Sequence, residues 1–440
     1  MSGGAGGDVE EPVAGVGRGA EPMAGVLDDI TVLEVASWIA APSCGALMAD
    51  MGADVIKVEP LGGDGMRGKL RQPSPANGME HADVPFQLDN RGKRSIAVDL
   101  SHPDGAALVR ELAGRADVLI TNLLPGRLAR YGLAPDQLRA AHPALVYALV
   151  TGYGSTGPDA DRSAFDLTAF FGRGGVMSLV GEPGDPAHAF RPGQGDHPTG
   201  LALLSAVLAA LRWRDRTGEG QVVETALLRV AAWSIGCDVS AALVDRTQPN
   251  RRARTEPFSP LNTRFRCGDG AWINLSTSDQ RLWGRFCHVI GRSDLADHER
   301  YATPVDRFRN GRELMAVLDD VFASQPSDHW APLLDGSGVV WAKVAELPEL
   351  VDDPQARAIG MYAEVHDPDA GTFETLAAPF TLSHAAVAVR GPAPGVGEHT
   401  AEVLAQLGVD PTRIDALLEA GVAADPDGER ARGGRPGGLA

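Results

Sequence analysis

Strands and helices alternate regularly between residues 30 and 154. The β-branched run ITVLEV (30–35) precedes a helical sequence, APSCGALMADMGA, and a second strand-like run, DVIKVE (54–59). The same order of strand, helix and strand returns before Gly154. Such βαβ units build a parallel sheet with helices on both faces, so the predicted fold class is α/β. Right-handed crossovers place ligands at the carboxyl ends of the strands.

The chain is too long for one usual core. Its 440 residues predict two domains. Composition changes in the Pro- and Arg-rich linker TQPNRRARTEPFSPLNT, and the sequence RFRCGDGAWINLST after it predicts a β-hairpin. Helices expected at 280–291 and 309–324 complete a smaller α+β domain. The Gly-rich, polar ends of the chain, 1–26 and 425–440, are expected to be disordered tails.

Charge and cysteine content exclude several classes of function. The formal net charge of −18 argues against nucleic acid or an anionic membrane as the main partner. The four cysteines show no metal-ligand spacing, which indicates a reducing compartment and no structural zinc. No long apolar run or signal peptide is apparent in this sequence. A soluble cytoplasmic protein without a metal is therefore expected.

Basic residues collect near the predicted strand ends. Guanidinium groups suit phosphate oxygens, so a phosphate-bearing ligand is one interpretation, with Arg67 assigned to its site. A solvated turn is the other interpretation for each residue taken alone. No GxGxxG follows the first strand, which disfavours a dinucleotide dehydrogenase. The basic residues concerned are Arg67, Arg91, Lys93, Arg94, Arg127 and Arg130.

The sequence GQGDHPTG places Asp196 before a long apolar segment. Pro198 suits the first position of a helix, and Asp196 then lies beside the helix N-terminus, where negative charge is favoured. One interpretation is a capping aspartate. The other is a carboxylate nucleophile, with Gly195 leaving room for a thioester to approach. His197 follows directly along the backbone, so its side chain is expected to point elsewhere, and a general-base role is less favoured.

A set of motifs extends in order from about Leu27 to about Val422. The motifs are LDDITVLEVASWIAAPSCGALMADMGADVIKVEPLGGDGMRG, NRGKRSIAVDL, ADVLITNLLPGRLARYGL, GYGSTGP, GQGDHPTGLALLSAVLAAL, QVVETAL and GVGEHTAEVLAQLG. Together they resemble one family, the class III coenzyme A transferases, which includes formyl-CoA and carnitine CoA-transferases and α-methylacyl-CoA racemases.

The resemblance implies a Rossmann-like large domain made from both chain ends, a small domain between them, and an interlocked, ring-like homodimer. The expected parts are 27–230 for the first part of the large domain, 231–262 for a linker helix and loop, 263–350 for the small domain and 351–424 for the return to the large domain.

The resemblance also assigns roles to residues. It places the catalytic aspartate at Asp196, preceded by Gly195. Coenzyme A contacts are implied in four segments, and coenzyme A is expected as substrate with no other cofactor. The implied contacts are Trp38, Ile39 and Ala40; Val98, Asp99, Leu100 and Ser101; Asn122, Leu123 and Arg130; and Arg162, Phe165 and Asp166.

Two departures from the family pattern affect the expected activity. Phe165 stands where the racemases have a histidine, and phenylalanine cannot exchange a proton, so two-base racemisation is disfavoured. A second racemase carboxylate falls roughly at Asp279. The segment 256–260 is not Gly-rich, unlike the corresponding loop of the oxalate-using members, which disfavours formyl or oxalyl substrates.

The sequence therefore predicts transfer of coenzyme A from an acyl-CoA to a carboxylic acid through an acyl-aspartyl anhydride and an aspartyl-CoA thioester. Backbone N–H groups of the glycine loop are expected to stabilise the oxyanion. The alternatives are an α-methylacyl-CoA racemase or epimerase that uses another base pair, and a coenzyme A-binding homologue without turnover.

Overall fold

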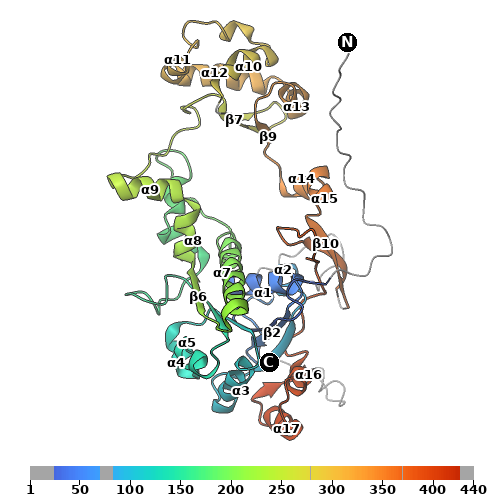
Figure 1. Ribbon diagram of the computed structural model, residues 1–440. Helices are drawn as coiled ribbons and strands as arrows, with labels where there is room; N and C mark the ends of the chain where they lie inside the picture. Colours follow the sequence, from blue (N-terminus) through green and yellow to red (C-terminus); the bar gives the residue numbers. More distant parts are fainter. Residues whose placement is uncertain (1–23, 70–82, 278, 369, 427–440) are drawn as a thin grey trace, which may run out of the picture.

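A seven-stranded sheet forms the centre of the larger domain (Figure 1). The computed structural model describes residues 24–69, 83–277, 279–368 and 370–426. The strand order is β12-β3-β2-β1-β4-β5-β6, parallel from β3 to β6, with β12 antiparallel to β3. The strands are β1 (Thr31–Val35), β2 (Asp54–Glu59), β3 (Arg94–Val98), β4 (Val118–Thr121), β5 (Val146–Thr151), β6 (Val222–Ala226) and β12 (Ala423–Ala424).

Helices cover both faces of this sheet, as predicted. Side chains alternate between two cores along each strand, so that Val32 joins one core and Leu33 the other. Helices α1 (Ala40–Asp50) and α7 (Asp196–Thr217) pack on the first face. The second face carries α3 (Pro103–Ala113), α4 (Pro125–Tyr131), α5 (Pro135–Ala141), α16 (Thr400–Gln406) and α17 (Pro411–Glu419). The C-terminal segment thus returns to the sheet domain.

The small domain lies apart from the sheet and is joined to it by two chain segments (Figure 1). The predicted hairpin is present as β7 (Asn262–Arg266) and β8 (Trp272–Ser276). The domain has its own buried aromatic and aliphatic core. Its other elements are β9 (Trp341–Lys343), η2 (Gln280–Leu282), α10 (Trp283–Val289), η3 (Ser293–Leu295), α11 (Pro304–Arg309), α12 (Gly311–Ala323) and α13 (Ser327–Asp335).

The return path carries a second hairpin that packs beside α2 (Val84–Asn90). The amide of Gln87 on α2 donates a hydrogen bond to Asp367 (2.9 Å). The elements of this path are α14 (Leu347–Val351), α15 (Pro354–Ala358), β10 (Tyr362–Asp367) and β11 (Gly371–Leu376).

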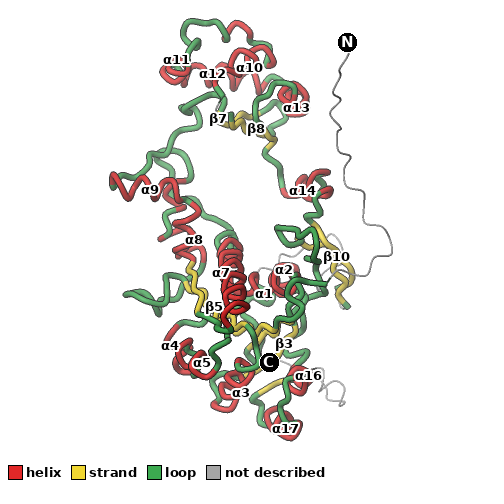
Figure 2. The backbone as a smooth tube through the Cα atoms, in the orientation of Figure 1, coloured by secondary structure: helices red, strands yellow, loops and turns green. Residues whose placement is uncertain are grey.

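Two helical segments are each divided into two helices. The apolar segment 227–245 forms α8 (Leu227–Ser234) and α9 (Gly236–Asp245), bent by 86° at the break (Figure 2). Gly236 follows the break, and glycine is a poor helix former. The C-terminal amphipathic segment likewise divides into α16 and α17, because Gly408 adopts a left-handed backbone (φ 75°).

The segment before α7 is also irregular. It contains the π-helix η1 (Leu167–Arg173) and the short α6 (Val176–Leu179), separated at Gly175 (φ 87°). At the N-terminus, Gly25 forms a bridge with Ala386, so ordered contacts begin before the expected Leu27. Residues 1–23 of the tail predicted at 1–26, and residues 427–440 of that predicted at 425–440, lie outside the described residues.

Candidate functional site

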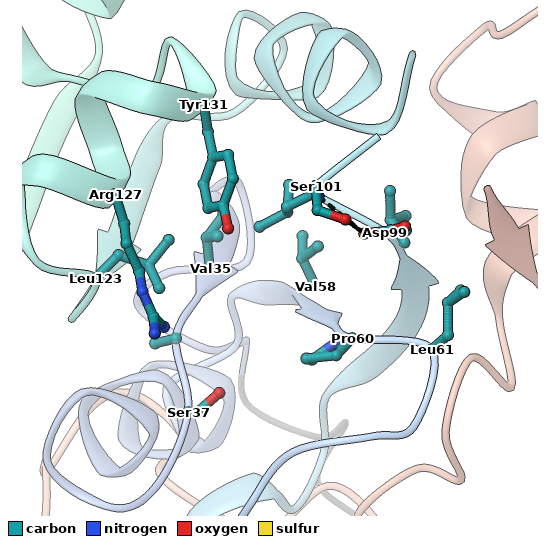
Figure 3. Close-up of a pocket in the computed structure, with 13 residues that line it drawn as sticks. Val35, Ser37, Val58, Pro60, Leu61, Asp99, Ser101, Leu123, Arg127 and Tyr131 are labelled. Atoms are coloured by element: carbon teal, nitrogen blue, oxygen red, sulfur yellow. Dashed lines mark hydrogen bonds between the residues drawn. The ribbon is translucent and has the colours of Figure 1, made fainter. Parts of the chain in front are cut away.

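The carboxyl ends of β1, β2 and β3 surround a cavity of about 360 Å³, here called the strand-end cavity (Figure 3). Asp99 accepts hydrogen bonds from the backbone N–H (2.8 Å) and the hydroxyl (2.6 Å) of Ser101, which fixes the turn after β3. Arg127 and Tyr131 reach the cavity from α4. Its lining residues are Val35, Ala36, Ser37, Val58, Pro60, Leu61, Val98, Asp99, Leu100, Ser101, Leu123, Arg127 and Tyr131.

A second cavity of about 290 Å³, the Asp196 cavity, holds the predicted nucleophile in its wall. It shares Ser37, Leu123 and Arg127 with the strand-end cavity, so an extended ligand can reach both. Its lining is mostly apolar. The lining residues are Ser37, Trp38, Ala40, Asn122, Leu123, Leu124, Arg127, Val150, Thr151, Gly152, Ser163, Ala164, Phe165, Asp196 and Leu227.

Asp196 is the first residue of α7, and Gly195 occupies the capping position without a side-chain cap. The helix begins two residues earlier than Pro198 predicted, so that proline is its third residue. Within the described part of the chain, the Asp196 carboxylate has no hydrogen-bond partner, and the capping interpretation is therefore not supported. Burial, followed by the negative charge of Asp166, raises the pKa of Asp196 to about 7, although His197 opposes the shift.

Asp166 holds the loop that leads to the nucleophile. Its buried carboxylate accepts hydrogen bonds from the backbone N–H groups of Gly193 (2.9 Å) and Gly195 (3.2 Å). These two N–H groups, which the sequence suggested for oxyanion stabilisation, are therefore already engaged by the protein. Asp166 itself does not line either cavity.

Gly195 is required by packing within the protein. A Cβ at this position would lie 2.7 Å from Phe170 Cγ and 3.0 Å from Asp166 Cβ. The missing side chain lets the loop approach Phe170 and Asp166. That it also leaves room for a thioester stays a prediction.

Trp38 forms a strained corner of the Asp196 cavity. Its φ of 71° is unusual for a bulky residue and costs of order 1–3 kcal/mol. The Trp38 N–H donates to Asp64 (3.1 Å), and Asp64 is paired with Lys57 (2.8 Å). The indole also meets the ring of Phe165 edge to face, with the ring centroids 5.1 Å apart. This buried support holds the two aromatic rings at the cavity wall.

His197 turns toward α2, as the backbone argument predicted. Its Nε2 lies 3.0 Å from Oδ1 of Asp89, whose side chain is 3% exposed while that of His197 is 43% exposed. Burial lowers the pKa of His197, but the hydrogen bond to Asp89 and the charges of Asp89, Asp196 and Asp166 outweigh burial and raise it. The imidazolium form is thus favoured next to the nucleophile.

The predicted site residues fall into two groups. One group lines the cavities: Trp38, Ala40, Val98, Asp99, Leu100, Ser101, Asn122, Leu123, Phe165 and Asp196. The other group does not: Ile39, Arg67, Arg130, Arg162, Asp166 and Gly195.

Physical reasons separate the second group from the cavities. Ile39 is buried against Met66 and Phe86. Arg67 is engaged by Glu59, with its Nη2 2.6 Å from Oε1. Arg130 and Arg162 are exposed outside both cavities.

Three other basic residues are also committed to ion pairs. The phosphate interpretation is wrong for Arg91, Lys93 and Arg94, which pair with Asp50 (2.7 Å), Glu34 (2.7 Å) and Asp54 (2.5 Å). Arg91 and Lys93 are buried as well. Burial lowers the pKa of Lys93 to about 8, despite the opposing charge of Glu34.

Arg127 is the basic residue that sequence reasoning noted but did not assign. It precedes Arg130 by three residues, on the first turn of α4, and lines both cavities. Pro125 at the start of this helix was the available signal, because it places Arg127 close to the end of β4. Tyr131 and Asp64 were missed altogether.

Asp279 gives no support to a second proton-transfer group. It lies in the small domain, caps η2, and pairs with Arg281 (2.8 Å). The hydrogen bond from Arg281 lowers the pKa of Asp279 to about 2. Asp279 does not line the Asp196 cavity.

Neither a metal centre nor a single membrane-spanning helix is found in the described residues. Within residues 24–69, 83–277, 279–368 and 370–426, no group of three or more His, Cys, Asp or Glu side chains could hold a metal ion. Across those same residues no single helix meets the length and hydropathy needed to cross a bilayer; α8 and α9 do so only when taken together across their bend.

Comparison with known proteins gives consistent matches. The model of CoA-transferase family III matches residues 27–400. The chain is 33% identical to (R)-2-hydroxy-4-methylpentanoate CoA-transferase of Clostridioides difficile, covering 90% of this chain and 99% of that protein. It is 35% identical to succinate–glutarate CoA-transferase of Agrobacterium fabrum (87% and 95%). A crystal structure of a CAIB/BAIF family protein from Brucella suis has a TM-score of 0.78 at 32% identity (87% and 100%).

Proposed function

Since the chain belongs to CoA-transferase family III, we propose that it moves coenzyme A from an acyl-CoA donor to a carboxylic acid acceptor, with Asp196 as the nucleophile. One observation carries this proposal. Asp196 lines a cavity that shares its wall with the strand-end cavity, and its carboxylate has no hydrogen-bond partner in the described part of the chain. A carboxylate without partners at such a place is free to attack a carbonyl carbon.

The proposed reaction preserves the thioester energy in each step. An Asp196 oxygen attacks the thioester carbonyl, the C–S bond breaks, and an acyl-aspartyl anhydride and coenzyme A thiolate form. The thiolate attacks the aspartyl carbonyl and releases the donor acid, leaving an aspartyl-CoA thioester. The acceptor carboxylate then displaces the thiolate, which attacks the new acyl group and regenerates the Asp196 carboxylate. Water must be excluded, because it would hydrolyse the anhydride.

The two cavities support one orientation of coenzyme A. We assign its adenine end to the strand-end cavity and its thioester to the Asp196 cavity. Arg127 lines both, so its guanidinium is placed to meet phosphate charge between them. Arg127→Gln is expected to raise the KM for acyl-CoA about tenfold with a smaller effect on kcat, by removing a charge-assisted contact made throughout the reaction. The exposed Arg130→Gln is the matched control.

We also propose that the functional unit is the expected interlocked homodimer. The α8–α9 bend exposes a large apolar surface, with Trp233 86%, Leu243 63% and Val244 87% exposed. Surfaces of this kind are typical of protein interfaces. Light scattering of the purified protein should give the mass of a dimer, and a Trp233→Glu, Val244→Glu variant should give that of a monomer.

The alternative of two-base racemisation gains nothing from the site. Phe165 occupies the cavity wall without an exchangeable proton, and Asp279 is paired in the small domain. Deuterium entering the α-carbon of an acyl-CoA without an added acid would favour racemisation over transfer.

The decisive experiment is coenzyme A exchange with the purified protein, using succinyl-CoA or acetyl-CoA and a library of acids. Asp196→Asn should abolish exchange, whereas Asp279→Asn, the matched control, should retain it. Borohydride or hydroxylamine trapping should modify the peptide that contains Asp196. Full activity of Asp196→Asn would overturn the nucleophile, and coenzyme A binding without exchange would indicate a non-catalytic homologue.

A further inference from the structure

Three carboxylates meet at the start of α7. Asp89 comes from α2, Asp166 from the residue before η1, and Asp196 from α7 itself. The negative charges of all three carboxylates act on one basic group, His197, and raise its pKa. Asp89 is also influenced by Lys93, which is held by Glu34 (2.7 Å). An additional negative charge here is costly, because like charges in a buried place resist ionisation.

The histidine is fixed by its contact with Asp89. The 3.0 Å distance from Nε2 to Oδ1 joins a half-exposed ring to a buried carboxylate. The ring lies beside the loop as well, since a Cβ on Gly193 would lie 3.6 Å from its Cε1. The imidazole thus lies between Asp89 and the Gly193 loop, on the residue that follows Asp196 in the first turn of α7.

We propose that His197, held as an imidazolium by Asp89, is a positioning residue that keeps Asp196 ionised against the charge of Asp166. This inference rests on the proposed role of Asp196 as nucleophile. The histidine transfers no proton in this scheme and does not contact the reacting atoms. Its positive charge stabilises the carboxylate before attack and again when the last step regenerates it.

The charge explains why a histidine is useful at this position. A neutral side chain at position 197 would leave Asp196 beside the negative charges of Asp166 and Asp89, with no positive charge from α7 to compensate them. The burial of Asp89 makes it a strong hydrogen-bond acceptor for the imidazolium, since a buried carboxylate needs a partner. Asp89 thus keeps His197 protonated, and the positive charge of His197 stabilises the Asp196 carboxylate.

The test compares three variants by the pH dependence of kcat/KM for coenzyme A exchange. His197→Gln removes the charge and keeps a donor for Asp89. His197→Lys restores a permanent charge. The control is His188→Gln, which removes another half-exposed histidine paired with an aspartate (3.4 Å) outside both cavities.

We expect His197→Gln to move the acidic limb of the profile upward by about one pH unit, which lowers kcat/KM about tenfold at pH 6 and little at pH 9. His197→Lys should return the limb to the wild-type position or below it, and His188→Gln should not move it. An unchanged limb in His197→Gln, or an equal loss at every pH, would overturn the charge role.

A second measurement does not depend on turnover. The 13C carboxyl resonance of Asp196, identified by its absence in Asp196→Asn, can be titrated in the wild type and in His197→Gln. The inference predicts a higher midpoint in the variant, and equal midpoints would overturn it. If none of the tested acids accepts coenzyme A from the wild-type protein at any pH, the proposed function fails. This titration would still decide whether His197 controls the charge of Asp196.

Discussion

Two groups of buried or half-buried carboxylates in the large domain have opposite surroundings. In the paired cluster, Glu34 contacts both Lys57 (3.0 Å) and Lys93 (2.7 Å), and Lys57 also pairs with Asp64 (2.8 Å). In the acidic cluster of Asp89, Asp166 and Asp196, the cation at the start of α7 is His197. The paired cluster contains as many cations as anions, whereas the acidic cluster contains an excess of negative charge.

The comparison shows how one domain uses burial for two purposes. Burial alone raises the pKa of a carboxyl group, but the hydrogen bonds and charge of Arg67 outweigh it at Glu59 and lower the pKa there. Asp196 has no comparable ion pair. The charge of His197 lowers the pKa of Asp196 but does not outweigh burial and the charge of Asp166, and the pKa rises to about 7. Paired carboxylates support the structure, including the strained Trp38, whereas the unpaired one is kept at a higher energy and can react.

The largest expected effect is on the paired cluster. Lys57→Met should lower the free energy of unfolding by about 3–5 kcal/mol, because it leaves Glu34 and Asp64 buried with less compensation. Urea denaturation followed by circular dichroism measures the change. Lys343→Met is the control, since Lys343 pairs with Glu349 at the surface and should contribute about 1 kcal/mol or less. Equal losses in the two variants would contradict the distinction between clusters.

A smaller effect of opposite sign is expected for the acidic cluster. The folded protein holds the pKa of Asp196 above that of the unfolded chain, so between about pH 4 and pH 7 the folded state binds more protons. Stability is therefore lost as the pH rises through this range. Asp196→Asn removes the free-energy cost of ionising residue 196 in the folded protein. Allowing for partial exposure, the variant should be more stable by roughly 1–3 kcal/mol at pH 8 and hardly more stable at pH 4.

Asp50→Asn provides the contrast for that measurement. Asp50 pairs with buried Arg91 (2.7 Å), so its loss should destabilise the protein. Unfolding at pH 8 should thus separate the two aspartates by the sign of their effects, whereas at pH 4 Asp196→Asn should have hardly any effect. A destabilised Asp196→Asn at pH 8 would show that Asp196 is a structural residue like Asp50.

Local sequence patterns were sufficient to predict the parallel sheet and to place Asp196 at the start of a helix. The alternation of strands and helices gives the parallel order, and the sequence GQGDHPTG marks the start of α7. The partners of charged residues were not predictable in the same way. Arg67 and Arg127 look equivalent in the sequence, yet one is neutralised by Glu59 and the other lines both cavities.

Contacts between distant segments explain most of the remaining differences. Asp166 and Gly195 are 29 residues apart, and Asp89 and His197 are 108 apart, so no local pattern could show that each pair meets. Trp38 is left-handed because Asp64, 26 residues later, holds its N–H. Tertiary contacts of this kind set the backbone and the charge of the site, which local propensity cannot specify.

The smallest expected effect tests whether Asp166 acts through charge or only through the loop. Asp166→Asn keeps the side-chain size and an acceptor for the N–H of Gly193 or Gly195, but removes the charge that raises the pKa of Asp196. The pKa of Asp196 should fall by about one unit, equivalent to about 1.4 kcal/mol, and the acidic limb of kcat/KM should move to lower pH. This is the reverse of His197→Gln, so combining the two changes should return the limb toward its wild-type position. A loss of activity that is uniform with pH would mean that Asp166 serves only to hold the loop, and the excess of negative charge would then not be what makes Asp196 different from the paired carboxylates.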